Sequence, residues 1–98
     1  MKTLQTIKKE AFHQLMQAIS AINEPDEAKA FLTDLCTPAE LESMADRWQV
    51  VPLLQKGMPY RTIHDETGVS VTTITRVARS LTMGSGGYLL IAERLEPS

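Results

Sequence analysis

The sequence predicts an all-α protein of about six helices, two of which form a helix-turn-helix between about Tyr60 and Leu81. Along most of the chain, apolar residues recur three and four positions apart, as they do on one face of a helix. Proline and glycine interrupt this pattern at intervals that suit short helices and turns. No segment keeps the strict alternation of apolar and polar residues that is typical of a half-buried strand.

The first two predicted helices carry broad apolar faces. Between Leu4 and Ile22 the apolar residues fall at helical spacing, with polar residues such as Lys8 on the opposite side. Asn23-Glu24-Pro25 breaks the pattern, and proline suits the first turn of a new helix because its missing N–H has no partner there. The apolar stripe of this short second helix contains Ala28, Phe31, Leu32 and Leu35.

Residues 37–40, Thr-Pro-Ala-Glu, form a start signal for a third helix. Thr37 can cap this helix, Pro38 suits its first turn, and Glu40 can complete a capping box. Pro52 lies inside the apolar pattern that follows, so we expect a kink or an early end there, and Gly57 ends the segment in any case. The predicted buried face contains Leu41, Met44, Ala45, Trp48 and Val51.

The helix-turn-helix consists of a short helix at Tyr60–Thr67 and a second helix that Ser70 can cap and that runs to about Leu81. Gly68 stands in the turn between them, where the backbone needs a positive φ. His64 occupies a position where many such motifs have a small residue. The apolar residues expected to lock the two helices together are Ile63, Val69, Ile74 and Val77.

The second of these helices exposes side chains suited to the major groove of duplex DNA. Hydroxyl groups can bond base edges or phosphates, threonine methyl groups can touch thymine, and arginine can pair with guanine. No acidic residue occurs from Gly68 to Gly87, so this surface is locally positive although the net charge of the chain is −2. The predicted DNA-binding residues are Arg61, expected near a phosphate, and Ser70, Val71, Thr72, Thr73, Thr75, Arg76 and Arg79.

Several short motifs resemble those of the tryptophan repressor family, over roughly residues 35–82. Within that superfamily the whole chain is most similar to the YerC/YecD group of Trp-repressor-related proteins, which have a similar entry at Asp34–Thr37 and a similar tail at Gly87-Tyr88 and Glu93–Leu95. The resemblance implies an intertwined homodimer, and it implies that the helix from Ser70 enters the major groove. The motifs are Thr37-Pro38-Ala39-Glu40, Arg47, Leu54, Gly57, Thr73-Ile74-Thr75-Arg76 and Ser80-Leu81.

We therefore expect one Trp-repressor-like domain over residues 1–98. Residues 1–36 would serve dimerisation, residues 37–82 would form the helix-turn-helix core, and residues 83–98 would contain a last helix at Tyr88–Leu95 after a flexible glycine-rich break. The broad apolar face of the first helix favours a dimer, because a chain this short can hardly cover it. The alternative is a compact monomeric bundle.

The resemblance also bears on whether the protein binds a small-molecule effector. It implies that Thr37, Arg47, Arg76 and Ser80 stand at positions that line the corepressor pocket of the tryptophan repressor. Val77, however, replaces a glycine of that pocket, and Cys36 replaces a larger leucine. An added side chain in a packed site is sterically unfavourable, so tryptophan is not the expected ligand. The alternative role for Arg47 is a solvated partner of Glu40, Glu42 or a phosphate.

Other kinds of site have no support in the sequence. His13, Cys36 and His64 lack the spacing of zinc ligands, and Gly84–Gly87 lacks the lysine and the preceding strand of a phosphate loop. We expect no enzymatic activity, no cofactor and no membrane span, and the cytoplasm as the location.

The predicted function is a sequence-specific regulator of transcription, a repressor by resemblance, with double-stranded DNA and a second copy of the chain as partners. One alternative is a helical protein–protein interaction module that uses the same hairpin. Another is a replication-initiator-like binder of duplex DNA, because such domains share this helix-turn-helix superfamily.

Overall fold

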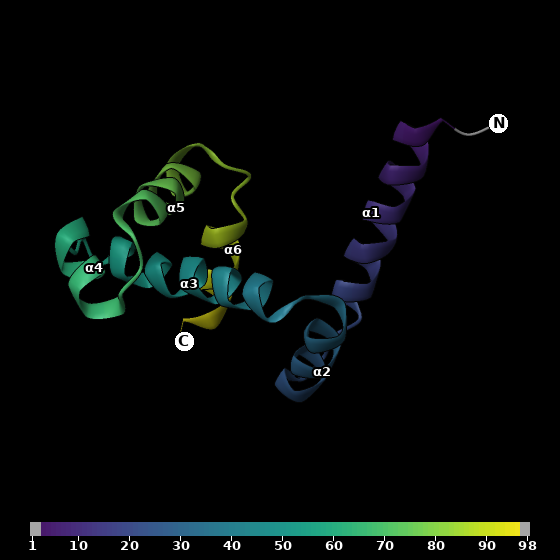
Figure 1. Cartoon of the computed structure of the whole chain (residues 1–98), viewed down its shortest axis with the longest axis horizontal. Coiled ribbons are helices and arrows are strands. Elements are labelled where there is room, and N and C mark those ends of the chain that lie inside the picture. The colour runs from purple at the N-terminus through teal and green to yellow at the C-terminus, as the bar shows by residue number, and fades with distance from the viewer. Residues whose placement is uncertain (1–2, 97–98) are drawn as a thin grey trace. The chain divides into compact units, whose positions relative to one another are not determined.

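The computed structural model describes residues 3–96 and has six α-helices and no strand in that range, which confirms the predicted all-α class (Figure 1). Met1, Lys2, Pro97 and Ser98, which the predicted domain includes, lie outside the described residues. The chain divides into two compact units, and the boundary between them in the sequence lies between Thr37 and Pro38. The helices are α1 (Leu4–Ser20), α2 (Pro25–Leu35), α3 (Pro38–Gln55), α4 (Tyr60–Thr67), α5 (Val71–Met83) and α6 (Gly87–Leu95).

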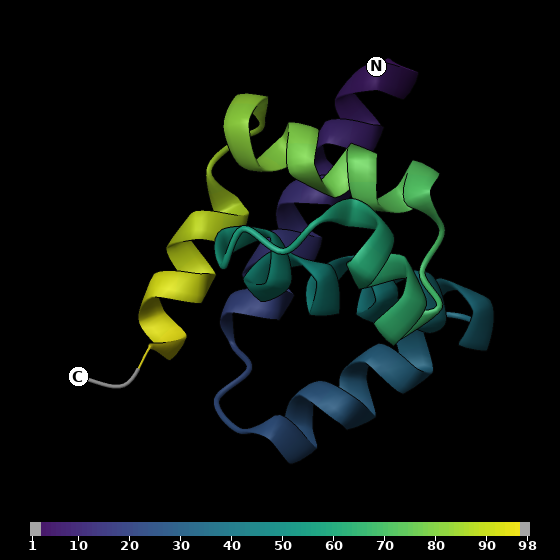
Figure 2. The same ribbon diagram turned by 90° about the vertical axis from the view of Figure 1, so that its left-hand side faces the viewer.

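The second unit contains α3 to α6 around a small apolar core. Figure 2 shows α4 and α5 (green) joined by a short turn, with α6 (yellow) after the C-terminal end of α5. Helix α5 packs against α3 and α4, and α6 packs against α3 and α5. The buried side chains are Val50, Val51, Ile63, Val69, Ile74 and Val77. Partly buried residues that surround them are Trp48, Leu53, Leu54, Met58, Leu81 and Tyr88.

Helix α3 excludes one of the two outcomes expected at Pro52, an early end, and it differs from the prediction in its buried face. It does not end early at Pro52: the helix continues through this residue, and the Pro52 carbonyl accepts a hydrogen bond from the Lys56 N–H at 3.1 Å. The lost N–H of one proline is tolerated because Val50 and Val51, immediately before it, are fully buried. The predicted buried face is also partly wrong. Met44 and Ala45 are exposed, and the core takes Val50 instead.

Helix α6 begins one residue before its predicted start. Gly86 precedes it with φ 84°, a left-handed conformation that glycine adopts without a steric penalty. The rings of Trp48 in α3 and Tyr88 in α6 lie 6.2 Å apart, within the range of favourable aromatic pairs. This contact attaches α6 to α3 across the glycine-rich loop.

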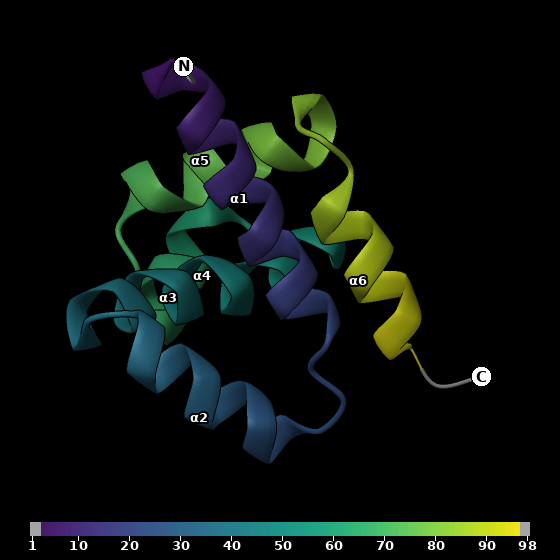
Figure 3. The same cartoon turned by 90° about the vertical axis from the view of Figure 1, so that its right-hand side faces the viewer.

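The first unit consists of α1 and α2, drawn in purple and blue in Figure 3. Thr3 caps α1, its hydroxyl oxygen accepting from the Thr6 N–H at 3.1 Å. The Glu27 carboxylate accepts from the backbone N–H groups of Asn23 at 2.9 Å and Glu24 at 3.2 Å at the start of α2. Both bonds favour the ionised carboxylate and hold the pKa of Glu27 below its ordinary value.

The apolar face of α1 is largely exposed, and that of α2 is only partly covered. Neither helix has a buried residue, and Leu4 and Phe12 are 66% and 63% exposed. Cys36 is half-buried. Exposed apolar surface of this extent marks an interaction site more often than a free surface. The assignment of residues 1–36 to dimerisation stays a prediction at this point.

Candidate nucleic-acid interface

The turn between α4 and α5 has the geometry that the sequence predicts. Helix α4 ends at Gly68, whose φ of 76° is left-handed and whose N–H donates to the His64 carbonyl at 2.8 Å. The residues predicted to lock the two helices together are all buried, which confirms their predicted place in the core: Ile63, Val69, Ile74 and Val77.

Side-chain hydrogen bonds add to this turn. The His64 ring donates through Nδ1 to the Val69 carbonyl at 2.8 Å. The Thr67 hydroxyl donates to the Ile63 carbonyl at 2.7 Å and accepts from the Val69 N–H at 3.1 Å. Neither His64 nor Thr67 was predicted from the sequence to have a role in the turn. The only sequence signal for this role is their distance from the turn glycine. His64 lies four residues before Gly68 and Thr67 lies one residue before it, so that each side chain can reach backbone groups of the turn.

Ser70 caps α5, as predicted. Its hydroxyl oxygen accepts from the Thr73 N–H at 3.2 Å, and its hydroxyl hydrogen is donated to the Thr73 side-chain oxygen at 3.0 Å. Thr73 was expected to be exposed but is half-buried, because its side chain folds back onto this cap. The turn and the first residues of α5 are therefore held by both packing and hydrogen bonds.

One face of α5 remains open to solvent. The predicted DNA-binding residues other than Thr73 are exposed, and those within α5 lie at positions separated by three or four residues, opposite Ile74 and Val77. The first turn of α5 has no acidic residue. Arg61 is exposed in the first turn of α4. The exposed residues of α5 are Val71, Thr72, Thr75, Arg76 and Arg79, and we call this set the α5 face.

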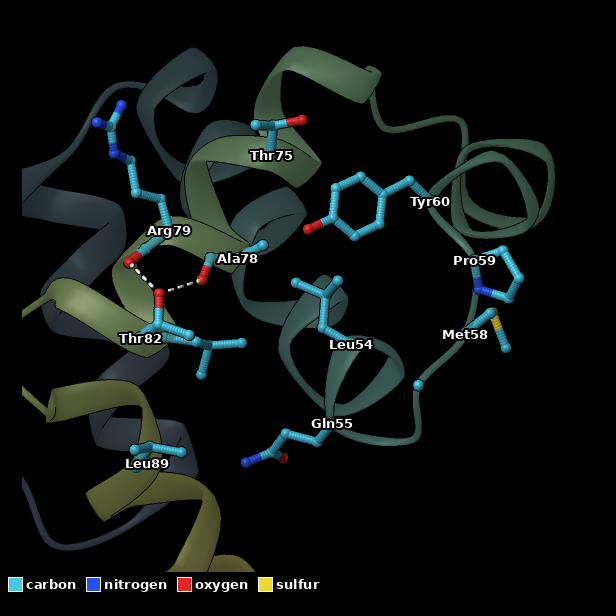
Figure 4. Close-up of a pocket in the computed structure, with 12 residues that line it drawn as sticks. Leu54, Gln55, Met58, Pro59, Tyr60, Thr75, Ala78, Arg79, Thr82 and Leu89 are labelled. Atoms are coloured by element: carbon cyan, nitrogen blue, oxygen red, sulfur yellow. Dashed lines mark hydrogen bonds between the residues drawn. The ribbon is translucent and has the colours of Figure 1, made fainter.

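A hollow of about 860 Å³ adjoins the α5 face (Figure 4). Thr75 and Arg79 line it from α5, Leu54 lines it from α3, and the Tyr60 ring is directed toward it from the start of α4. Thr82 lies at its edge and donates to the Arg79 carbonyl at 3.2 Å. None of the predicted effector residues lines this hollow.

The predicted effector residues are spread over three elements. Thr37 is exposed at the end of the first unit, Arg47 is half-buried in α3, and Arg76 is exposed in α5. Ser80 is half-buried and lines a second hollow of about 580 Å³ with Trp48, Tyr88, Ile91 and residues 84–87. Val77 is 1% exposed and belongs to the core.

Comparison with known proteins places this arrangement in a family. The family described as Trp repressor protein matches residues 10–96. The chain belongs to the Trp repressor family. A relative in this family, the uncharacterized YerC protein of Bacillus subtilis, is 37% identical over 83 residues, covering 85% of this chain and 80% of its own length. A Trp operon repressor homolog of Xylella fastidiosa is 31% identical over 75 residues, covering 76% of this chain and 82% of its own length.

Two solved structures of the Trp repressor type are similar to this chain. A TrpR-like protein of Eubacterium eligens has a TM-score of 0.82 at 42% identity and covers 88% of this chain and 89% of its own. A Staphylococcus aureus protein, provisionally described as a Trp repressor, has a TM-score of 0.84 at 35% identity and covers 97% and 95%. These neighbours confirm the predicted resemblance to the Trp repressor superfamily and its YerC group.

Membership of the Trp repressor family makes the chain a member of a family of DNA-binding regulators. Between residues 3 and 96, no group of three or more histidine, cysteine or carboxylate side chains could hold a metal ion. In the same range no helix is long and apolar enough to cross a membrane.

The hydrogen bonds at the turn predict the stability of two variants. Replacing Ser70 with alanine removes the cap of α5 and should lower the free energy of unfolding by about 1 kcal/mol. Replacing His64 with alanine leaves the Val69 carbonyl without this donor and should also cost about 1 kcal/mol. Urea denaturation at one protein concentration measures both values. Ser85→Ala, an exposed serine outside the turn, is the control and should stay within about 0.5 kcal/mol.

Proposed function

We propose that this protein is a sequence-specific, double-stranded DNA-binding regulator of transcription that acts as a repressor. The observation that carries the proposal is the α5 face, in which Arg76, Arg79 and hydroxyl or methyl groups are exposed on a helix fixed at its N-terminal end by the α4–α5 turn. A helix of this kind fits the major groove with its N-terminal residues toward the bases. The absence of acidic residues from Gly68 to Gly87 removes repulsion from the phosphates.

Within this proposal, the exposed cations have different roles. Arg76 lies on the α5 face and is assigned to base contact, because its guanidinium can pair bidentate with guanine. Arg61 lies at the start of α4 and is assigned to a phosphate, where it adds affinity without sequence preference. Ser70 and Thr73 hold the cap and bring backbone N–H groups at the start of α5 close to the sugar-phosphate backbone.

Arg76→Ala and Arg61→Ala should therefore weaken DNA binding in distinguishable ways. Arg76→Ala should cost about 1–3 kcal/mol on the preferred site and reduce the preference for that site. Arg61→Ala should weaken all duplexes alike and lower the salt dependence of log K by about one. Fluorescence anisotropy over a salt series, on a site selected from random duplex DNA, measures both effects.

An unchanged affinity of the Arg76→Ala variant for the selected site would contradict the assignment of α5 to the groove. Failure to select any duplex would instead favour a protein-binding role for the same hairpin. The selected sequence also separates a repressor from a replication-initiator-like protein, since an operator and an origin repeat lie in different parts of a genome.

We further propose that the chain acts as a homodimer through α1 and α2. The uncovered apolar residues of α1 support this, because Phe12 and Leu4 are both more than half exposed. A two-fold dimer would place two α5 helices about 34 Å apart and would favour a palindromic operator. Both units would then contribute to function, one by pairing the chains and the other by contacting DNA.

The dimer predicts a defined mass in solution. Light scattering at micromolar concentration should give twice the mass of 10.9 kDa for the wild type. Phe12→Glu places a charge in the proposed interface, so it should shift the mass toward one chain. His13→Glu, an adjacent charge substitution on another side of α1, is the matched control. A wild-type protein that stays at the mass of one chain would contradict the dimer.

We infer that tryptophan is not the effector of this protein. Thr37, Arg47, Arg76 and Ser80 match positions of the repressor's pocket, but Val77, which follows Arg76 in the sequence, is buried in the core. Protein interiors are closely packed, so the buried Val77 side chain leaves no room for an indole ring beside it. Arg47 is then available to a phosphate, whereas Arg76 is available to a base.

Val77→Gly tests this inference. Removing the side chain should lower the free energy of unfolding by about 3 kcal/mol, since it leaves a cavity and places glycine inside a helix. Titration calorimetry with tryptophan should show no binding to the wild type and measurable binding to Val77→Gly. Val77→Ala retains a Cβ atom and is the matched control, with intermediate behaviour. Saturable binding of tryptophan to the wild type would contradict the steric explanation.

A further inference from the structure

Three hydroxyl groups along α5 and at its cap use their hydrogens within the helix and do not offer them to bases. The Ser70 hydroxyl donates to the Thr73 side-chain oxygen at 3.0 Å, and the Thr75 hydroxyl donates to the Val71 carbonyl at 2.9 Å. Thr82, further along α5, donates to backbone carbonyls as well. A hydroxyl whose hydrogen is used inside the helix presents only its lone pairs and, in threonine, its methyl group.

An apolar side chain stands at the end of α5 that would meet the bases first. Val71 is the first residue of the helix. It is 48% exposed and does not belong to the core of its unit. Thr75 follows one turn later on the same side of the helix, so its methyl group extends the apolar surface of Val71. A β-branched residue is also a poor choice for an exposed helix position on intrinsic propensity.

Only one group in the major groove offers an apolar partner to such a surface. This group is the 5-methyl of thymine, because the other base edges present hydrogen-bond donors and acceptors. Burying one methyl or methylene group contributes about 0.8 kcal/mol, which corresponds to about a fourfold change in affinity. Hydrogen bonding through the donors of Arg76 and Arg79 remains available for guanine on the same face.

We propose that Val71, together with the Thr75 methyl group, determines sequence specificity by contacting the 5-methyl groups of thymine within each half-site. Thymine is then distinguished by its methyl group at these positions, whereas guanine is distinguished by the arginine side chains. This inference rests on the proposed DNA-binding function, and it names the chemical feature of the DNA that the α5 face contacts.

The test replaces single thymines of the selected duplex by deoxyuridine. Uracil keeps every hydrogen-bonding group of thymine and lacks only the methyl group, so a loss of affinity reports methyl contact alone. The wild-type protein should lose about fourfold in affinity at one or two thymines of each half-site. At the same positions, 5-methylcytosine should bind about fourfold more tightly than cytosine, because it restores the methyl group on a different hydrogen-bonding edge.

Protein variants assign the effect to a residue. Val71→Ala should remove the difference between thymine and uracil at one position and leave binding to the uracil duplex nearly unchanged. Thr75→Val keeps a methyl group and loses the hydroxyl, so it should preserve the difference. Met83→Ala removes an exposed apolar side chain at the other end of α5, where it is 77% exposed, and is the matched control. Circular dichroism melting curves check that the surface variants fold.

The possible outcomes are distinguishable. Equal affinity for thymine and uracil at every position of a selected site would overturn the inference and leave the proposed DNA-binding function intact. A uracil effect that persists at the same thymine in both Val71→Ala and Thr75→Ser would overturn the assignment to these residues. Failure to select any preferred duplex would overturn the proposed function, and this inference with it.

Discussion

The apolar side chains buried around the α4–α5 turn are the interaction on which the second unit depends. Each fully buried aliphatic residue contributes about 1.5–3 kcal/mol, whereas each hydrogen bond at the turn contributes about 1 kcal/mol. Packing therefore determines where α5 lies, and the bonds from His64 and Ser70 adjust its first turn. Because the same helix carries the α5 face on its other side, the core also determines which residues are exposed on that face.

This dependence explains why one substitution can affect two properties. Val77 is part of the core. The resemblance implies that the tryptophan repressor has a glycine at this position, beside its corepressor. A valine there adds buried apolar surface and removes space at the same time. The side chain that stabilises α5 is thus the one that, in the proposed function, opposes an indole ligand. A helix held in place by its own core has less need of a ligand to position it.

The two units have opposite relations to solvent. The second unit buries six apolar side chains and presents a polar, acid-free face on α5. In the first unit no residue of α1 or α2 is buried, and many of its large apolar side chains are exposed. A small domain has a limited core of its own, so covering these helices by a second chain would add a large share of the apolar burial. In the proposed dimer, assembly and stability would be inseparable.

The sequence by itself determined the helices, the turn and the α5 face, because each depends on local chemistry: helical spacing, a glycine with positive φ, and a serine cap. Tertiary structure decided the rest. The sequence could not show that α3 continues through Pro52, because the burial of Val50 and Val51 offsets a missing hydrogen bond only once the helices pack. It could not show that Met44 is exposed, since spacing identifies an apolar face without stating what covers it. The use of the Ser70 and Thr75 hydroxyls within the helix is likewise visible only in three dimensions, because a hydroxyl's partner depends on its rotamer.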